Sequence, residues 1–171
     1  FRVKNFTESF INEIKLNFEK ISSAILKTCK FIRQTGINDN ALRSKYALIP
    51  IIYYVYKNNL DINNLAKYKE DKNKIVIWLK MALLKGMFGG QPDSILPKLR
   101  ELINLSEGCF PTEQIVQAFK NTPKDITIDK DFIIEKIENT HYGSSEAYLI
   151  LSLITEQDPQ FEYHVDHMHP K

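Results

Sequence analysis

Apolar residues recur every three or four positions between about Asn5 and Gln34, which is the spacing of one side of an α-helix. The members of this stripe are Phe10, Ile14, Phe18, Ile21, Ile25, Cys29 and Ile32. Asn5 followed by Glu8 has the form of a capping box, and a glycine with turn-forming polar residues in the range 35–40 ends the pattern. The sequence therefore predicts a long amphipathic helix with this stripe on one side.

Two further segments are densely apolar. In the range 41–57, residues 51–56 could form a strand because they are β-branched and aromatic, but segment length and helical neighbours favour a buried helix, kinked or started at Pro50. Polar residues 58–73 predict a surface connection. Around Trp78 apolar residues cover most sides of a helix, which predicts a helix through the centre of the core that stops at the glycines of 86–90.

Four shorter helices are expected after the glycines. Their predicted starts are, in order, Asp93 or Ser94, Pro111 with Thr112, Asp129, and Ser144 to Glu146. Residues 157–159 break the helical pattern, and 161–165 alternate like a short strand. The prediction is an all-α fold, an irregular bundle of about seven helices over 1–156, followed by a separate unit at 157–171 that begins with a strand.

The composition describes a globular protein and favours no particular partner. Hydrophobic residues make up 43% of the 171 residues, and 23 basic against 21 acidic residues give a net charge of +2. Cys29 and Cys109 have no CxxC spacing, which predicts reduced thiols in a cytoplasmic protein. The longest apolar run, 47–56, is far shorter than the roughly 20 residues of a membrane span, so no transmembrane helix is expected. Because Phe1 opens the chain without a signal pattern, we expect an internal fragment.

The main candidate for site chemistry lies near the end of the sequence. Three of the four histidines, His164, His167 and His169, fall within the last eight residues, together with Asp166. The carboxylate of Asp166 can bind a divalent cation, and the imidazole of His167 can deprotonate water, as phosphodiester hydrolysis requires. His164 and His169 are possible accessory residues, and all four side chains could alternatively bind zinc or another transition metal. Adjacent residues on a strand point to opposite sides, so Asp166 and His167 can act at the same metal site only if the chain bends, and Pro170 is placed to help with such a bend.

The run from His164 to Lys171 resembles the opening motif of HNH, or ββα-metal, nucleases. It is most similar to the form found in proteins that join a ParB-like N-terminal domain, a helical middle region and an HNH C-terminal domain. These proteins include the GmrSD-type modification-dependent restriction endonucleases. The helical part resembles that middle region in residues 41–46, in the Trp78 helix ending at 87–90, and at Phe110-Pro111.

The resemblance implies that Asp166 binds a divalent metal such as Mg²⁺ or Mn²⁺ and that His167 is the catalytic general base. The implied activity is DNA cleavage that restricts foreign or modified DNA, with DNA, a ParB-like domain and the rest of the HNH domain as partners. Because the family's later asparagine and second histidine would follow Lys171, we expect 157–171 to be the truncated start of an HNH domain and this chain alone to be inactive. The alternative is a non-catalytic helical binding or scaffold module with an incidental histidine-rich end.

Other features have structural explanations that outweigh functional ones. Six lysines lie in and around the Trp78 helix: Lys67, Lys69, Lys72, Lys74, Lys80 and Lys85. They could contact phosphates, but the acidic residues interleaved with them favour a solvated helix face. The three tyrosines of 53–56 could stack on bases, but they are expected to pack in and around the core. His141 is expected in a loop or at a helix cap.

Overall fold

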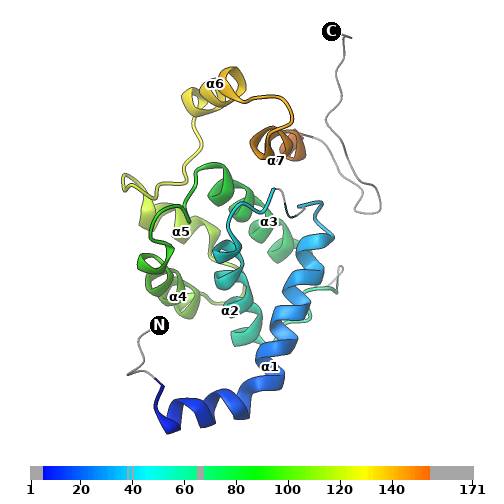
Figure 1. Cartoon of the computed structure of the whole chain (residues 1–171), viewed down its shortest axis with the longest axis vertical. Coiled ribbons are helices and arrows are strands. Elements are labelled where there is room, and N and C mark those ends of the chain that lie inside the picture. Colours follow the sequence, from blue (N-terminus) through cyan, green and yellow to red (C-terminus); the bar gives the residue numbers. More distant parts are fainter. Residues whose placement is uncertain (1–5, 38, 40, 65–67, 155–171) are drawn as a thin grey trace.

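A computed structural model describes residues 6–37, 39, 41–64 and 68–154, which form α-helices and two short 3₁₀ helices and contain no strand (Figure 1). The helices are α1 (Glu8–Arg33), η2 (Lys45–Ala47), α2 (Leu48–Asn58), α3 (Lys69–Leu84), η3 (Pro92–Ser94), α4 (Leu96–Leu105), α5 (Thr112–Phe119), α6 (Lys130–Asn139) and α7 (Ser145–Ile154). The seven α-helices confirm the all-α prediction, and α2 confirms helix over strand for 51–56. The strand predicted at 161–165 and the unit predicted at 157–171 lie outside the described residues.

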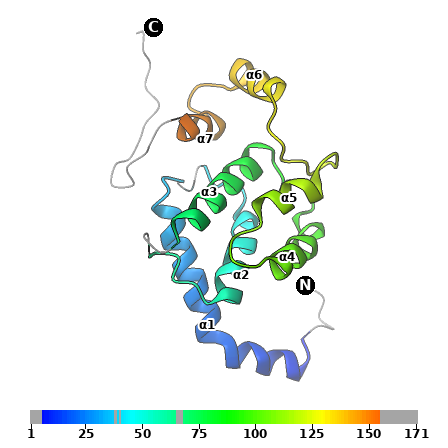
Figure 2. The ribbon, with the colours of Figure 1, turned by 180° about the vertical axis from the view of Figure 1, so that it is seen from behind.

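Helix α3 lies at the centre of the bundle, as its apolar residues predict. It packs against η2, α5 and α7 (Figures 1 and 2). Trp78 is fully buried on this helix, and its ring centre lies 5.2 Å from that of Phe110 and 6.1 Å from that of Phe88. A helix with neighbours on several sides needs apolar residues around most of its circumference, which explains the wide stripe.

Helix α2 packs against α1 and α4. Pro50 lies in its first turn, where a backbone N–H has no intrahelical partner, so the proline is accommodated there. Tyr54 is buried, while the Tyr53 hydroxyl donates a hydrogen bond to Asn104 Oδ1 (2.7 Å) and the Tyr56 hydroxyl donates one to Asn17 Oδ1 (3.2 Å). These contacts confirm that the three tyrosines pack in and around the core.

The prediction that 58–73 is a polar surface connection is partly wrong. Helix α3 already begins at Lys69, and its first turns bury Asp71 and Lys72. Ile62, within the connection itself, is fully buried. A run of charged residues suggests solvent, but a buried carboxylate is tolerated where hydrogen-bond donors surround it, and Asp71 has such donors.

Helix α1 buries a different side from the predicted stripe. Its buried residues are Ala24, Thr28, Phe31 and Ile32, so Ile32 alone belongs to both sets. The helix begins after Thr7, whose Oγ1 accepts a hydrogen bond from the Phe10 amide (3.2 Å), and not after Asn5, which lies outside the described residues. Every residue from Phe6 to Leu16 is exposed, and the figures show these turns leaving the bundle at the bottom of Figures 1 and 2.

The remaining helix starts agree with the sequence except at α4. Ser94 does not cap that helix: its hydroxyl donates to the Gln91 carbonyl (2.8 Å) within η3, and Ile95 is the cap. Asp129 caps α6 by accepting from the Phe132 amide (2.8 Å), and Ser144 accepts from the Ala147 amide (3.1 Å) at the start of α7. Within the described ranges, no helix is long and apolar enough to cross a membrane.

Candidate functional site

The predicted site residues His164, Asp166, His167 and His169 lie outside the described residues, so the structure places none of them. In the part of the chain that is described, no group of three or more His, Cys, Asp or Glu side chains is positioned to hold a metal ion. His141 is exposed between α6 and α7, where its carbonyl accepts a hydrogen bond from the Ser144 amide (3.1 Å). The prediction of a loop position for His141 is confirmed.

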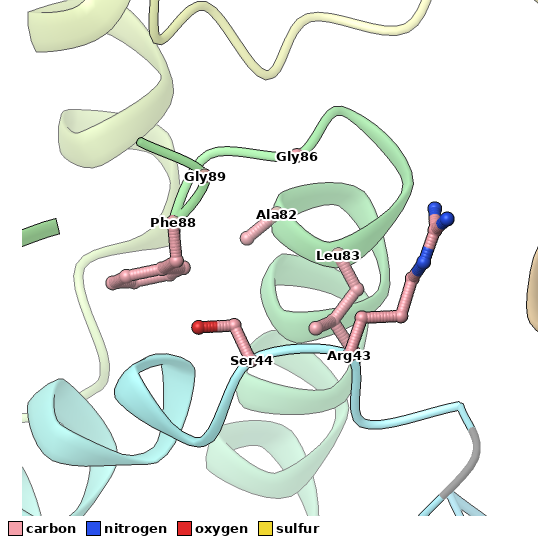
Figure 3. Close-up of a pocket in the computed structure, with 7 residues that line it drawn as sticks. All are labelled: Arg43, Ser44, Ala82, Leu83, Gly86, Phe88 and Gly89. Atoms are coloured by element: carbon pink, nitrogen blue, oxygen red, sulfur yellow. The ribbon is translucent and has the colours of Figure 1, made fainter. Parts of the chain in front are cut away.

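A cavity of about 270 Å³ lies between the segment that precedes η2 and the C-terminal end of α3 (Figure 3). Its described lining residues are Arg43, Ser44, Ala82, Leu83, Gly86, Phe88 and Gly89. The cavity therefore brings together residues of the segments 41–46 and 87–90, which are far apart in the sequence.

The shape of this cavity depends on how α3 ends. Gly86 has a φ of +64°, a conformation that favours glycine, and its amide donates to the Leu83 carbonyl (3.2 Å). The Met87 amide donates to the Ala82 carbonyl (2.9 Å), which completes a Schellman motif. This turn folds Met87 and Phe88 back into the core, where both are buried.

The segment Phe110-Pro111 also packs against α3. Phe110 is fully buried, and both its ring and that of Phe88 contact the ring of Trp78. Ser44 lines the cavity together with Phe88. Phe88 and Phe110 thus have packing roles around one tryptophan, whereas Arg43, Lys45 and Tyr46 are exposed.

Few polar groups face the cavity. Figure 3 shows the Ser44 hydroxyl directed toward the side where Phe88 lies, whereas the Arg43 guanidinium points away. Arg43 Nη1 lies 2.9 Å from Glu146 Oε1 of α7, and Lys136 Nζ lies 3.2 Å from the same oxygen. Burial opposes ionisation of Glu146, but these hydrogen bonds outweigh it and hold the pKa of Glu146 below its usual value. The described wall has no carboxylate or imidazole, so it offers a binding surface without an acid–base pair.

A buried polar cluster centred on Asp71 holds the Phe110 segment against α3. The Tyr54 hydroxyl lies 2.9 and 2.8 Å from the two carboxylate oxygens of Asp71, and the Phe110 amide donates to Oδ1 (2.6 Å). Burial raises the pKa of Tyr54, and the hydrogen bond and charge of Asp71 raise it further. The sequence did not indicate this cluster, because Asp71 stands in a run of charged residues and its partners are distant in the chain.

Next to this cluster, Lys74 Nζ lies 3.2 Å from Cys109 Sγ and 3.2 Å from Glu70 Oε1. These two hydrogen bonds raise the pKa of Lys74. Cys29 and Cys109 are both free thiols. Lys74 therefore ties the loop that carries Cys109 to α3.

The prediction of a solvated lysine face is wrong for Lys72 and Lys80, which are buried. Lys80 Nζ donates to the Ser152 carbonyl of α7 (2.5 Å), and burial lowers the pKa of Lys80. Burial also lowers the pKa of Lys72, partly opposed by the charge of Asp61. The Lys85 ammonium lies 3.9 Å from the centre of the Phe132 ring. Helix α3 therefore does not present these lysines as one basic face toward phosphates.

No family model matches this sequence, and no curated protein matches it.

Proposed function

We propose that this chain supplies the helical region and the first residues of the nuclease domain of a metal-dependent, HNH-type DNA endonuclease that restricts foreign or modified DNA. The observation that carries the proposal is the run His164 to Lys171, in which Asp166 and His167 are adjacent and two further histidines flank them. An acid and an imidazole side by side supply a metal ligand and a proton acceptor for phosphodiester hydrolysis.

The Asp166 carboxylate suits a divalent cation such as Mg²⁺ or Mn²⁺, whereas the flanking imidazoles of His164 and His169, as accessory ligands, would favour a transition metal. When bound, such a cation stabilises the negative charge that develops on the phosphate during cleavage. His167 accepts the proton of the attacking water, a role that suits a group whose usual pKa lies near 6.5.

The helical body supports a positioning role because the helix that precedes the motif is anchored to it. In α7, Leu149 is fully buried, and the Ser152 carbonyl accepts a hydrogen bond from Lys80 of α3. Glu146 at the start of the same helix pairs with Arg43. The Tyr148 hydroxyl donates to the Gly36 carbonyl (2.5 Å) beyond the end of α1. Three hydrogen bonds to separate parts of the chain therefore hold α7, the last described helix before the motif.

The test uses the protein encoded by the full reading frame, incubated with supercoiled plasmid and Mg²⁺ or Mn²⁺. We expect nicking that requires the metal and that His167→Ala reduces at least 100-fold, as loss of a general base does, while circular dichroism shows unchanged helix content. His141→Ala is the matched control, because it removes an exposed histidine outside the motif, and it should cleave normally. Unchanged cleavage by His167→Ala would exclude this residue as the base.

Two further observations bear on the alternative of a non-catalytic helical module. The 171-residue chain alone should not cleave DNA under any of these conditions. The reading frame past Lys171 should also encode an asparagine and a second histidine within roughly the next few dozen residues. If both residues are missing and the full protein is inactive with either metal, the nuclease proposal fails and the helical module is the better description.

A further inference from the structure

The cavity between α3 and the segment before η2 has walls that limit what it can hold. Its volume is about 270 Å³, and its apolar wall consists of the buried residues Ala82, Leu83 and Phe88. Gly86 and Gly89 also line it and are exposed. The cavity therefore joins a buried apolar wall to the surface of the protein, so a small molecule can enter it while the chain stays folded.

The glycine side of the cavity is bare backbone. A Cβ atom at Gly86 would meet no heavy atom within 4 Å, so open space lies beside this residue. Its φ of +64° disfavours the larger side chains that would fill that space. The Phe88 ring supplies an aromatic surface in the same cavity, and such a surface favours a second flat ring in edge or stacked contact.

Ser44 supplies the polar side chain of the cavity. It stands at the N-cap position of η2, where a serine hydroxyl commonly accepts a hydrogen bond from the helix backbone, but its side chain makes no such bond. Figure 3 shows this hydroxyl directed toward the side where Phe88 lies. The Arg43 guanidinium points away and pairs with Glu146 at 2.9 Å. Among the described lining residues, the cavity therefore offers one side-chain hydroxyl and no unpaired charge.

We propose that this cavity binds a small neutral molecule that consists of one aromatic ring and one hydrogen-bonding group, which contacts Ser44. An apolar cavity of about 150 Å³ is large enough to bind benzene, whereas pockets for drug-sized ligands begin at about 300 Å³. A volume of about 270 Å³ therefore suits a single substituted ring. The binding site lies wholly in the helical part of the chain, so it is independent of the proposed nuclease activity.

Phenol is the probe for the first experiment, in which the isotope-labelled 171-residue chain is titrated and followed by NMR. We expect saturable shifts of the amide signals of Ser44, Gly86 and Gly89, with a Kd of about 1 mM or below for a ligand of this size. The indole signal of Trp78 should shift as well, because its ring contacts that of Phe88. Absence of a saturable shift at these residues would overturn the proposal.

Filling the cavity tests where phenol binds. Ala82→Leu places a larger apolar side chain in the cavity, so phenol binding should weaken at least tenfold while circular dichroism shows unchanged helix content. Ala118→Leu is the matched control, because it makes the same change at an exposed position of α5, and it should bind phenol normally. Unchanged binding by folded Ala82→Leu would place phenol elsewhere and overturn the proposal.

A third variant tests the hydrogen bond and stays decisive if Ala82→Leu does not fold. Ser44→Ala should weaken phenol binding about fivefold and leave binding of toluene, which has a methyl group in place of the hydroxyl, unchanged. Ser94→Ala removes a serine hydroxyl that bonds to Gln91 outside the cavity, and it should affect neither probe. Equal effects of Ser44→Ala on the two probes would exclude Ser44 as the polar contact and overturn the proposal. These readouts measure binding and not cleavage, so their failure is distinct from failure of the nuclease proposal.

Discussion

Helix α3 and the N-terminal part of α1, residues Glu8–Phe18, here called the arm, relate sequence to burial in opposite ways. Helix α3 contains Asp71, Lys72 and Lys80 and buries all three, whereas the arm contains Phe10, Ile14 and Phe18 and exposes them. Both segments are helical, as their periodicity predicts. The difference shows that a periodic pattern identifies a helix and its apolar side, while the neighbouring elements decide which side is covered.

The two helices differ in the elements that pack against them. Helix α3 packs against η2, α5 and α7. Asp71 accepts hydrogen bonds from Tyr54 of α2 and from the Phe110 amide, and Lys80 donates one to Ser152 of α7. Helix α1 packs against α2, and its buried residues begin at Ala24. The arm therefore depends on local helix propensity and capping, whereas α3 depends on packing.

Truncating one aromatic residue in each helix gives the largest expected contrast. Trp78→Ala should lower the free energy of unfolding by about 3–5 kcal/mol, because it leaves a cavity beneath Phe88 and Phe110. Phe18→Ala should change it by less than about 0.5 kcal/mol, because this ring is 61% exposed. Urea unfolding at low micromolar protein concentration measures both. A large loss for Phe18→Ala would show that the arm is covered within one copy of the chain.

The buried hydroxyl of Tyr54 predicts a loss of stability at high pH. The unfolded chain releases this proton near the ordinary tyrosine pKa of 10.0, but burial and Asp71 raise the pKa of Tyr54 in the folded state. The folded state then binds more protons, so the contribution of Tyr54 to stability is constant below pH 10 and falls above it by up to about 1.4 kcal/mol per pH unit. Urea unfolding between about pH 9 and 11 should show a shallower fall for Tyr54→Phe. Tyr53→Phe, at an exposed hydroxyl, should retain the steep fall and serves as the control.

Replacing Lys72 should stabilise the protein. Its ammonium is buried and has no hydrogen-bond acceptor among the described residues, although it lies 5.7 Å from the centre of the Phe31 ring. Lys72→Met keeps the length of the side chain and removes a buried ammonium that has no hydrogen-bond acceptor, so we expect a gain of about 1 kcal/mol. Lys69→Met, an exposed position on the same helix, should leave stability unchanged. A loss of stability for Lys72→Met would show that the ammonium has a partner.

The sequence predicted the elements of this fold better than their environment. The wide apolar pattern around Trp78 indicated a central helix because such a helix needs apolar residues on most sides. Burial of Asp71 could not be predicted in the same way, because its donors Tyr54 and Phe110 lie 17 and 39 residues away in the chain. The cavity beside Ser44 and Phe88 likewise depends on a long-range contact that no local pattern encodes. The histidine-rich motif lies outside the described residues and stays a prediction.

The smallest and most local effect is expected from removing a capping side chain, and we compare the cap of α1, whose first turns lie outside the bundle, with the cap of α7, which packs within it. Thr7→Ala removes the acceptor for the Phe10 amide, so hydrogen exchange should accelerate in the first turns of α1. Because these turns are separate from the bundle, the global free energy of unfolding should change by less than about 0.3 kcal/mol. Ser144→Ala is the matched change at α7, which packs against α3, and it should lower the global value by about 1 kcal/mol. Equal global losses for the two variants would mean that the arm unfolds together with the bundle, and that the contrast between α1 and α3 is one of exposure alone.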